Sequence, residues 1–305
     1  MNRPTAAGLV AILLWSTTVA FSRTVSESLG PLTAGACVYT LGGTVSFAAA
    51  AMTPGGLRRL VAMPRRYLFG CGALFTLYTV LLYAAVGLAT SRAAVLAVGL
   101  ANYLWPSLLL LFSIPVLGRR PRRRLVPGML LALADTALAS TAGSGVGIRD
   151  LVRGGGEPIP VLLAAGAAVL WALYSNLARL WGPAQGSAVP LFLLASGAAF
   201  LGLRVAAGES PPRDGGAAPA VLYLALFPTW LAYRLWDEAM LRGDLALAGA
   251  ASYFTPLLST LVSAAVLGVP LTPALAAAAV LVTAGALLSR SGVAGDVGAE
   301  PVRTS

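Results

Sequence analysis

Ten long apolar runs dominate this chain of 305 residues. Several of them reach the roughly 20 residues that a helix needs to cross a bilayer core. Hydrocarbon offers no partner to a backbone N–H or C=O group, so each run must pair its own groups as a helix. The pattern predicts an all-α integral membrane protein of about ten transmembrane helices. The predicted spans are 5–22, 32–52, 67–88, 93–117, 125–142, 158–178, 188–207, 218–238, 245–267 and 272–289.

The composition excludes most enzyme chemistry. The sequence contains no histidine, so it cannot form a histidine metal site or a Ser-His-Asp triad. It contains no lysine either, which excludes a Walker A loop and a Schiff base. We therefore expect no enzyme, no cofactor and no metal. The net charge of +10 comes from arginines in short loops between apolar runs, which indicates membrane orientation rather than nucleic-acid binding.

The chain shows an internal repeat. A shift of 150 residues aligns the span 93–117 with the span 245–267 without a gap. The shared residues include polar and helix-breaking types: Gly99 with Gly249, Tyr103 with Tyr253, Pro106 with Pro256, and Ser113 with Ser263. Such matches predict two five-helix repeats, 1–142 and 158–290. A glycine-rich linker, 143–157, separates them, and we expect the tail 291–305 to be disordered and cytoplasmic.

Because five is an odd number of spans, the second repeat must enter the membrane from the opposite face. The loop charges agree with an inverted repeat. The loop 119–124 is rich in arginine, whereas its counterpart 269–272 carries no charge. The positive-inside rule then places both termini and the loops 58–66 and 119–124 in the cytoplasm, and residues 143–157 outside. We expect a multi-pass protein of the inner membrane.

Two duplicated prolines mark a candidate substrate site. Pro106 and Pro256 lie near the middle of their spans, and each lacks the N–H that would pair with the carbonyl four residues earlier. Those carbonyls belong to Asn102 and Ser252, which are followed by Tyr103 and Tyr253. Interrupted helices that meet at the membrane midplane recur in carriers. The alternative is an ordinary kink.

Other residues at depth offer further candidates. Trp15, Tyr78, Trp171 and Tyr174 either line a cavity or pack helices together. Trp181, Trp230 and Trp236 are placed near span ends, where an interfacial belt is expected. Asp135 lies mid-membrane, where a charge costs at least about 2.5 kcal/mol, so it either couples transport to protons or makes a structural hydrogen bond. Arg234 and Glu238, with Asp237 beside them, have the spacing of an ion pair at the cytoplasmic end.

The whole chain resembles the EamA branch of the drug/metabolite transporter superfamily. The resemblance lies in the central helix of each half, 93–118 and 245–268, which ends in a Leu-Gly turn. Many members carry Gly-Glu at the second turn, where this chain has Gly268 and Val269, so any role of that acid is missing here. The run 102–106, Asn-Tyr-Leu-Trp-Pro, is similar to the aromatic amino-acid exporter branch.

This resemblance implies export of aromatic or bulky neutral amino acids by alternating access. The alternatives are export of other small metabolites or lipophilic cationic drugs, a membrane-embedded enzyme, and a channel. The expected partners are a small-molecule substrate and membrane lipid, with no nucleic acid and no protein partner.

The predicted orientation can be tested with single cysteines. After removal of Cys37 and Cys71, a cysteine at Ser144 should react with an impermeant thiol reagent on intact cells, and one at Arg122 should not. The reason is that arginine-rich loops are retained in the cytoplasm. Labelling at Arg122 without labelling at Ser144 would overturn the orientation.

Overall fold

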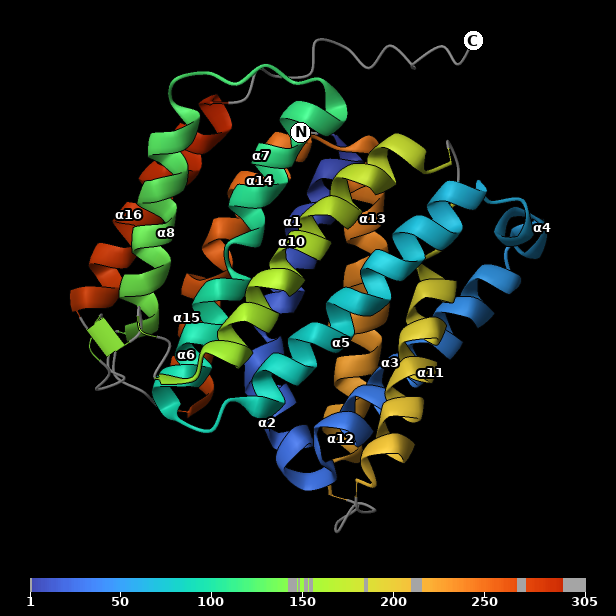
Figure 1. Cartoon of the computed structure of the whole chain (residues 1–305). Coiled ribbons are helices and arrows are strands. Elements are labelled where there is room, and N and C mark those ends of the chain that lie inside the picture. The colour runs from blue at the N-terminus through green and yellow to red at the C-terminus, as the bar shows by residue number, and fades with distance from the viewer. Residues whose placement is uncertain are drawn as a thin grey trace.

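The computed structural model describes residues 2–141, 147, 149–150, 153, 156–183, 186–209, 216–267 and 273–292. Every element in these ranges is a helix (Figure 1). The first half holds α1 (Arg3–Ser16), α2 (Thr18–Leu29), α3 (Pro31–Ala51), α4 (Gly56–Val61), α5 (Gly72–Leu88), α6 (Arg92–Asn102), α7 (Trp105–Leu117) and α8 (Leu125–Thr141). The second half holds α10 (Pro158–Trp181), α11 (Val189–Ala207), α12 (Ala218–Leu224), α13 (Ala232–Arg242), α14 (Leu245–Ala251), α15 (Thr255–Leu267) and α16 (Pro273–Ser291).

Five helical segments are long and apolar enough to cross a membrane, which makes the chain a multi-pass membrane protein. They are Pro31–Ala51, Arg66–Leu88, Ala93–Leu117, Pro158–Trp181 and Val189–Ala207. Four of the other predicted spans consist of shorter or interrupted helices, and the tenth corresponds to the continuous α16 of 19 residues. The first is divided at Thr17, and α8 has only 17 residues. The eighth contains a π-helical segment, Ala225–Leu231, with Pro228 inside it.

The helices are interrupted at the duplicated prolines, as expected from the sequence. In the first half α6 ends at Asn102, and Pro106 lies in the first turn of α7. In the second half a 3-10 turn, Ser252–Phe254, separates α14 from α15, whose second residue is Pro256. Proline is tolerated in a first helical turn because the N–H groups there have no partner within the helix.

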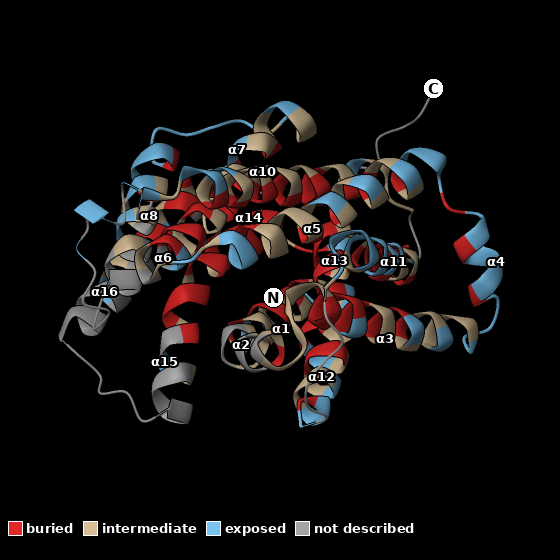
Figure 2. Ribbon diagram, turned by 60° about the horizontal axis from the view of Figure 1, so that its bottom comes forward, coloured by how far each residue is buried: buried red, intermediate tan, exposed pale blue. Residues whose placement is uncertain are grey.

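The helices form close pairs that run between the two halves of the chain. The most extensive contacts join α3 to α11, α5 to α10, α1 to α13, and α8 to α16. Figure 2 shows the buried residues concentrated along α10 and its neighbours, whereas α4 is mostly exposed. Glycines let α3 and α11 approach closely: a Cβ at Gly43 would lie 2.8 Å from the backbone nitrogen of Leu194, and one at Gly197 would lie 2.9 Å from that of Thr40.

The bundle has two distinct ends (Figure 1). The start of α1, the helix α4 and the turn after α7 lie at one end, here called the α4 end. The connection from α2 to α3 and the start of α12 lie at the other, here called the α12 end.

At the α12 end, Glu157 of the linker and Glu209 of the second half cap helices of the first half. Glu157 accepts hydrogen bonds from the backbone N–H groups of Thr90 (2.8 Å) and Ser91 (2.9 Å), at the start of α6. These bonds lower the pKa of Glu157 to about 2, and the bond from Thr90 has the largest effect. Glu209 accepts from the backbone N–H of Thr33 (2.8 Å), at the start of α3. Burial raises the pKa of Glu209, but its hydrogen bonds outweigh burial and the pKa is lowered overall.

The close crossing of α3 and α11 predicts a large difference between two glycines of the same helix. Gly197→Leu should destabilise the protein by about 1–3 kcal/mol, because the new side chain meets the backbone of α3. Gly202→Leu is the control, since a Cβ at that position would have no atom of another described helix within 4 Å. Thermal unfolding of the purified proteins in detergent measures the difference. Equal melting temperatures would contradict the crossing.

Candidate functional site

A cluster of aromatic side chains fills the centre of the bundle. Its members, here called the aromatic cluster, come from both halves of the chain: Trp15, Phe75, Tyr78, Trp105, Trp171, Tyr174, Tyr233 and Trp236. Trp171 lies at its middle. The centroid of its ring is 4.8 Å from that of Tyr78 and 6.3 Å from that of Trp105, and the other five lie between these limits. Only 2% of the surface of Trp171 is exposed.

Helical periodicity explains how these rings come together. Three helices each contribute a pair spaced by three residues, which places both rings on one face. The pairs are Phe75 with Tyr78 on α5, Trp171 with Tyr174 on α10, and Tyr233 with Trp236 on α13. Four of the eight residues, Trp15, Tyr78, Trp171 and Tyr174, are predicted site residues, and the structure brings all four into the cluster.

The indole N–H groups of two cluster members have hydrogen-bond partners, as buried tryptophans require. Trp15 donates from Nε1 to the backbone oxygen of Pro228, at 2.9 Å, in the π-helical segment. Trp236 donates from Nε1 to Oγ of Ser175, at 3.2 Å. These bonds fix the orientations of the Trp15 and Trp236 rings within the cluster.

One tryptophan expected at the interfacial belt lies elsewhere. Trp236 is fully buried in the aromatic cluster, so its assignment to the belt is wrong. Trp230 lines a cavity at the α4 end. The cause is the length of the helix: α13 continues to Arg242, one turn beyond the predicted end at 238, so residue 236 lies deeper than the prediction placed it. The sequence does contain a signal for this position, because the three-residue spacing of Tyr233 and Trp236 matches that of the pairs on α5 and α10.

The two helix interruptions lie beside the cluster and touch each other. The hydroxyl groups of Ser107 and Tyr253 lie 2.7 Å apart and are both buried, which joins the start of α7 to the 3-10 turn before α15. Ser252 donates from Oγ to the backbone oxygen of Ala248 at 2.7 Å. Asn102 has a buried side-chain oxygen, Oδ1, without a hydrogen-bond partner among the described residues.

The predicted site residues therefore form two neighbouring groups. Trp105 connects them, because it follows the first interruption and its ring contacts Trp171 and Trp236. Tyr103 is half-buried at the same interruption, and Pro106 and Pro256 are buried at their helix starts. The candidate coupling residue Asp135 lies in α8, and its side chain is outside the described residues. Within the described ranges, no group of three or more His, Cys, Asp or Glu residues is arranged to hold a metal ion.

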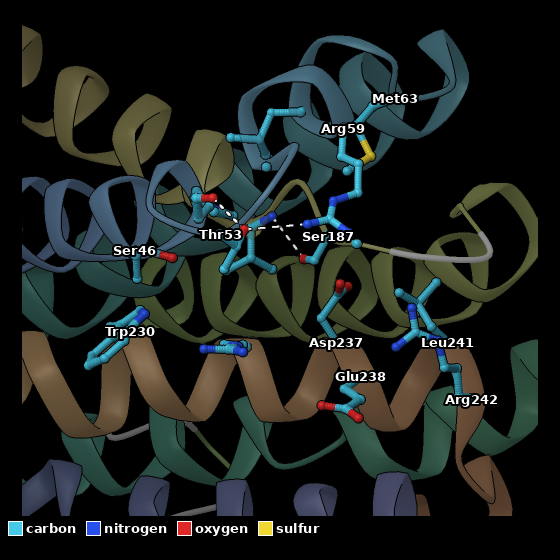
Figure 3. A pocket seen from close by; sticks show the side chains of 18 residues that line it. Ser46, Thr53, Arg59, Met63, Ser187, Trp230, Asp237, Glu238, Leu241 and Arg242 are labelled. Carbon is cyan, nitrogen blue, oxygen red and sulfur yellow. Dashed lines mark hydrogen bonds between the residues drawn. The ribbon is translucent and has the colours of Figure 1, made fainter.

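A cavity of about 280 Å³ opens at the α4 end, between α3, α4, the start of α11 and α13 (Figure 3). Its lining is strongly charged, with Arg59, Arg234, Asp237, Glu238 and Arg242. Asp237 is fully buried. It accepts hydrogen bonds from two tyrosine hydroxyl groups, Tyr67 to Oδ2 at 3.1 Å and Tyr174 to Oδ1 at 3.0 Å.

Asp237 therefore lies between this cavity and the aromatic cluster, to which Tyr174 belongs. The sequence pattern predicts Asp237 only beside an ion pair at the cytoplasmic end, so this buried position was not expected. Its partner Tyr67 stands 170 residues away in the sequence, in the π-helical segment Arg66–Cys71. No local pattern signals that contact.

Comparison with known proteins identifies the family. The model of the EamA-like transporter family matches residues 4–141 and 158–291. Three relatives are named "Aromatic amino acid exporter YddG". The protein of Escherichia coli strain K12 is 32% identical over 94% of this chain and 96% of its own. That of Salmonella typhimurium strain 14028s is 33% identical over 94% and 96%, and that of Ancylobacter novellus is 34% identical over 95% and 98%.

A solved structure titled "Crystal structure of protein" has the same fold. Its sequence is 34% identical to this one, and the two structures superpose with a TM-score of 0.76. The match covers 94% of this chain and 96% of the other. The match to a transporter family agrees with the expectation that the chain is not an enzyme. Because the family model matches nearly the whole chain and the relatives exceed 30% identity, this chain belongs to the EamA-like transporter family.

Proposed function

We propose that this protein exports aromatic or bulky neutral amino acids across the inner membrane by alternating access. The aromatic cluster carries the proposal, because it lies where helices of the two halves meet and presents the rings that bind an aromatic side chain. Offset or edge-to-face contacts between aromatic rings contribute about 0.5–1.5 kcal/mol each beyond burial. The names of the three relatives favour amino acids over other metabolites or lipophilic cationic drugs.

The proposed architecture is ten transmembrane helices in two inverted repeats, 1–142 and 158–290, joined by the linker 143–157. The helix pairings support it. The repeat relates the third predicted span, which contains α5, to the eighth, which contains α13, and the first predicted span to the sixth. The pair α5–α10 therefore corresponds to the pair α13–α1. In the pairs α3–α11 and α8–α16, each helix packs against its own counterpart in the other repeat. The two segments matched by the family model end and begin beside the proposed linker.

The proposed orientation places the α4 end in the cytoplasm, with both termini on that side. The arginine-rich segments 58–66 and 119–124 belong to this end, and the two helix-capping glutamates, Glu157 and Glu209, to the other. This asymmetry agrees with the positive-inside rule. The cavity at the α4 end would then open to the cytoplasm, from which an exporter collects its substrate.

The proposed substrate site lies between the halves, where the aromatic cluster meets the two helix interruptions. The interruptions supply polar groups inside an apolar wall, and a zwitterion needs such groups because burying unpaired charge is costly. Asn102 offers a side-chain oxygen without a partner. Tyr253 and Ser252 offer groups that already have partners and would exchange them on binding. Movement of one half against the other would open the site to each side in turn.

Replacing the central ring should impair this site. We expect Trp171→Ala to raise the KM for labelled phenylalanine at least about tenfold in proteoliposomes, because seven ring contacts are lost. Asn102→Ala and Tyr78→Ala should also weaken transport. Counterflow measured over a range of substrate concentrations gives the KM.

The matched control is Phe69→Ala. Phe69 is an aromatic residue of the same span as Tyr78, but 69% of its surface is exposed. Its removal should leave the KM unchanged. All variants are compared at equal thermal stability, since a packing defect would imitate a site defect. Normal transport by stable Trp171→Ala, Asn102→Ala and Tyr78→Ala proteins would show that the aromatic cluster is only helix packing.

Asp135 is proposed as a proton-coupling residue. We expect Asp135→Asn to change the pH dependence of transport between about pH 5 and 8 more than it changes expression, because a mid-membrane carboxylate is retained at a cost. Uptake with and without a pH gradient measures this effect. A variant with wild-type rates across the range would return Asp135 to a structural role.

A further inference from the structure

The carboxylate of Asp237 is held by hydroxyl groups from three different parts of the chain. Tyr67 donates from the span that contains α5, and Tyr174 donates from α10. Ser187, just before α11, also hydrogen-bonds to it. A carboxylate has about four acceptor positions on its two oxygens. These three partners leave capacity for a further donor, and Asp237 lines the cavity from which such a donor would come.

The cavity combines both signs of charge. Figure 3 shows Asp237 directed toward the cavity from α13, with Arg59 reaching in from the opposite side. Arg59 is held there by a hydrogen bond of 2.8 Å from its guanidinium group to the backbone oxygen of Pro54. Arg234 and Arg242 are exposed residues of the lining. Three arginines would oppose a simple cation, and Asp237 with Glu238 would oppose a simple anion, whereas a zwitterion matches both.

From this geometry we infer that the cavity at the α4 end is an entry site for amino acids and that Asp237 recognises their ammonium group. The inference rests on the proposed function. The arginines of the cavity attract the carboxylate of the substrate. The volume of about 280 Å³ is near the lower end, about 300 Å³, of small-molecule pockets, which suits one amino acid rather than a larger solute.

The position of Asp237 also orders the two sites. Tyr174 donates to Asp237 and its ring lies 5.0 Å from that of Trp171. An ammonium group that takes the remaining acceptor position of this carboxylate lies beside Tyr174. The substrate side chain then lies next to the aromatic cluster, which is the next site on the proposed path. Asp237 is thus a specificity-determining residue at the entrance of the path.

The test separates charge recognition from structure by comparing Asp237→Asn with Asp237→Glu. Asparagine keeps the size and one acceptor oxygen for the tyrosine hydroxyls but removes the charge. We expect Asp237→Asn to raise the KM for phenylalanine at least about tenfold, which is about 1.4 kcal/mol, and Asp237→Glu to retain most of the affinity. Asp150→Asn, at an exposed carboxylate that does not line the cavity, is the control and should change the KM less than about threefold.

A second measurement needs only the wild-type protein, so it remains decisive if the variants fail to fold. Counterflow of labelled phenylalanine is inhibited with phenethylamine, which has the ammonium group alone, and with 3-phenylpropionate, which has the carboxylate alone. We expect phenethylamine to compete more strongly. Equal competition, stronger competition by 3-phenylpropionate, or a loss of maximal rate at unchanged KM in stable Asp237→Asn protein would overturn the inference. Absence of phenylalanine counterflow in the wild type would instead overturn the proposed function.

Discussion

The contact between Trp171 and rings from four other helices holds the centre of this protein together. Its neighbours come from α1, α5, α7 and α13, and they lie on both sides of the linker. Within a bilayer, lipid is as apolar as leucine, so helices gain little from hiding apolar surface from it. Close packing and hydrogen bonds must hold the helices instead. Stacked and edge-on rings with paired indole N–H groups supply both.

The same cluster depends on helices that are not regular. The π-helical segment that contains Pro228 places a backbone oxygen where the indole N–H of Trp15 reaches it. The interruption before Trp105 lets that ring turn toward Trp171. Irregular backbone inside a membrane is tolerated only where protein covers it or a cavity borders it. These two irregular segments lie against the cluster, which provides that cover.

Much of the fold could be predicted from local sequence, because length, apolarity and proline act locally. The interruptions at Pro106 and Pro256 follow from a missing N–H, and the pairs on α5 and α10 follow from helical spacing. Trp236 and Asp237 were misplaced because the end of α13 carries charged residues that resemble a helix end at the membrane surface. Asp237 is buried only because Tyr67 and Tyr174 come from distant helices to meet it. A single sequence does not show which distant residues contact each other.

The two glutamates at the α12 end have a consequence for the response of the protein to acid. Glu157 ends the linker directly before the second half, and Glu209 belongs to the second half. Each caps a helix of the first half, at the end remote from the cavity. A glutamate whose pKa is lowered by folding stabilises the folded state above its ordinary pKa, and loses this effect only as the pH falls toward the folded value. Because that value is about 2 for Glu157, acidification to about pH 4 leaves it ionised. Mild acidity alone therefore leaves the bonds between Glu157 and the start of α6 in place.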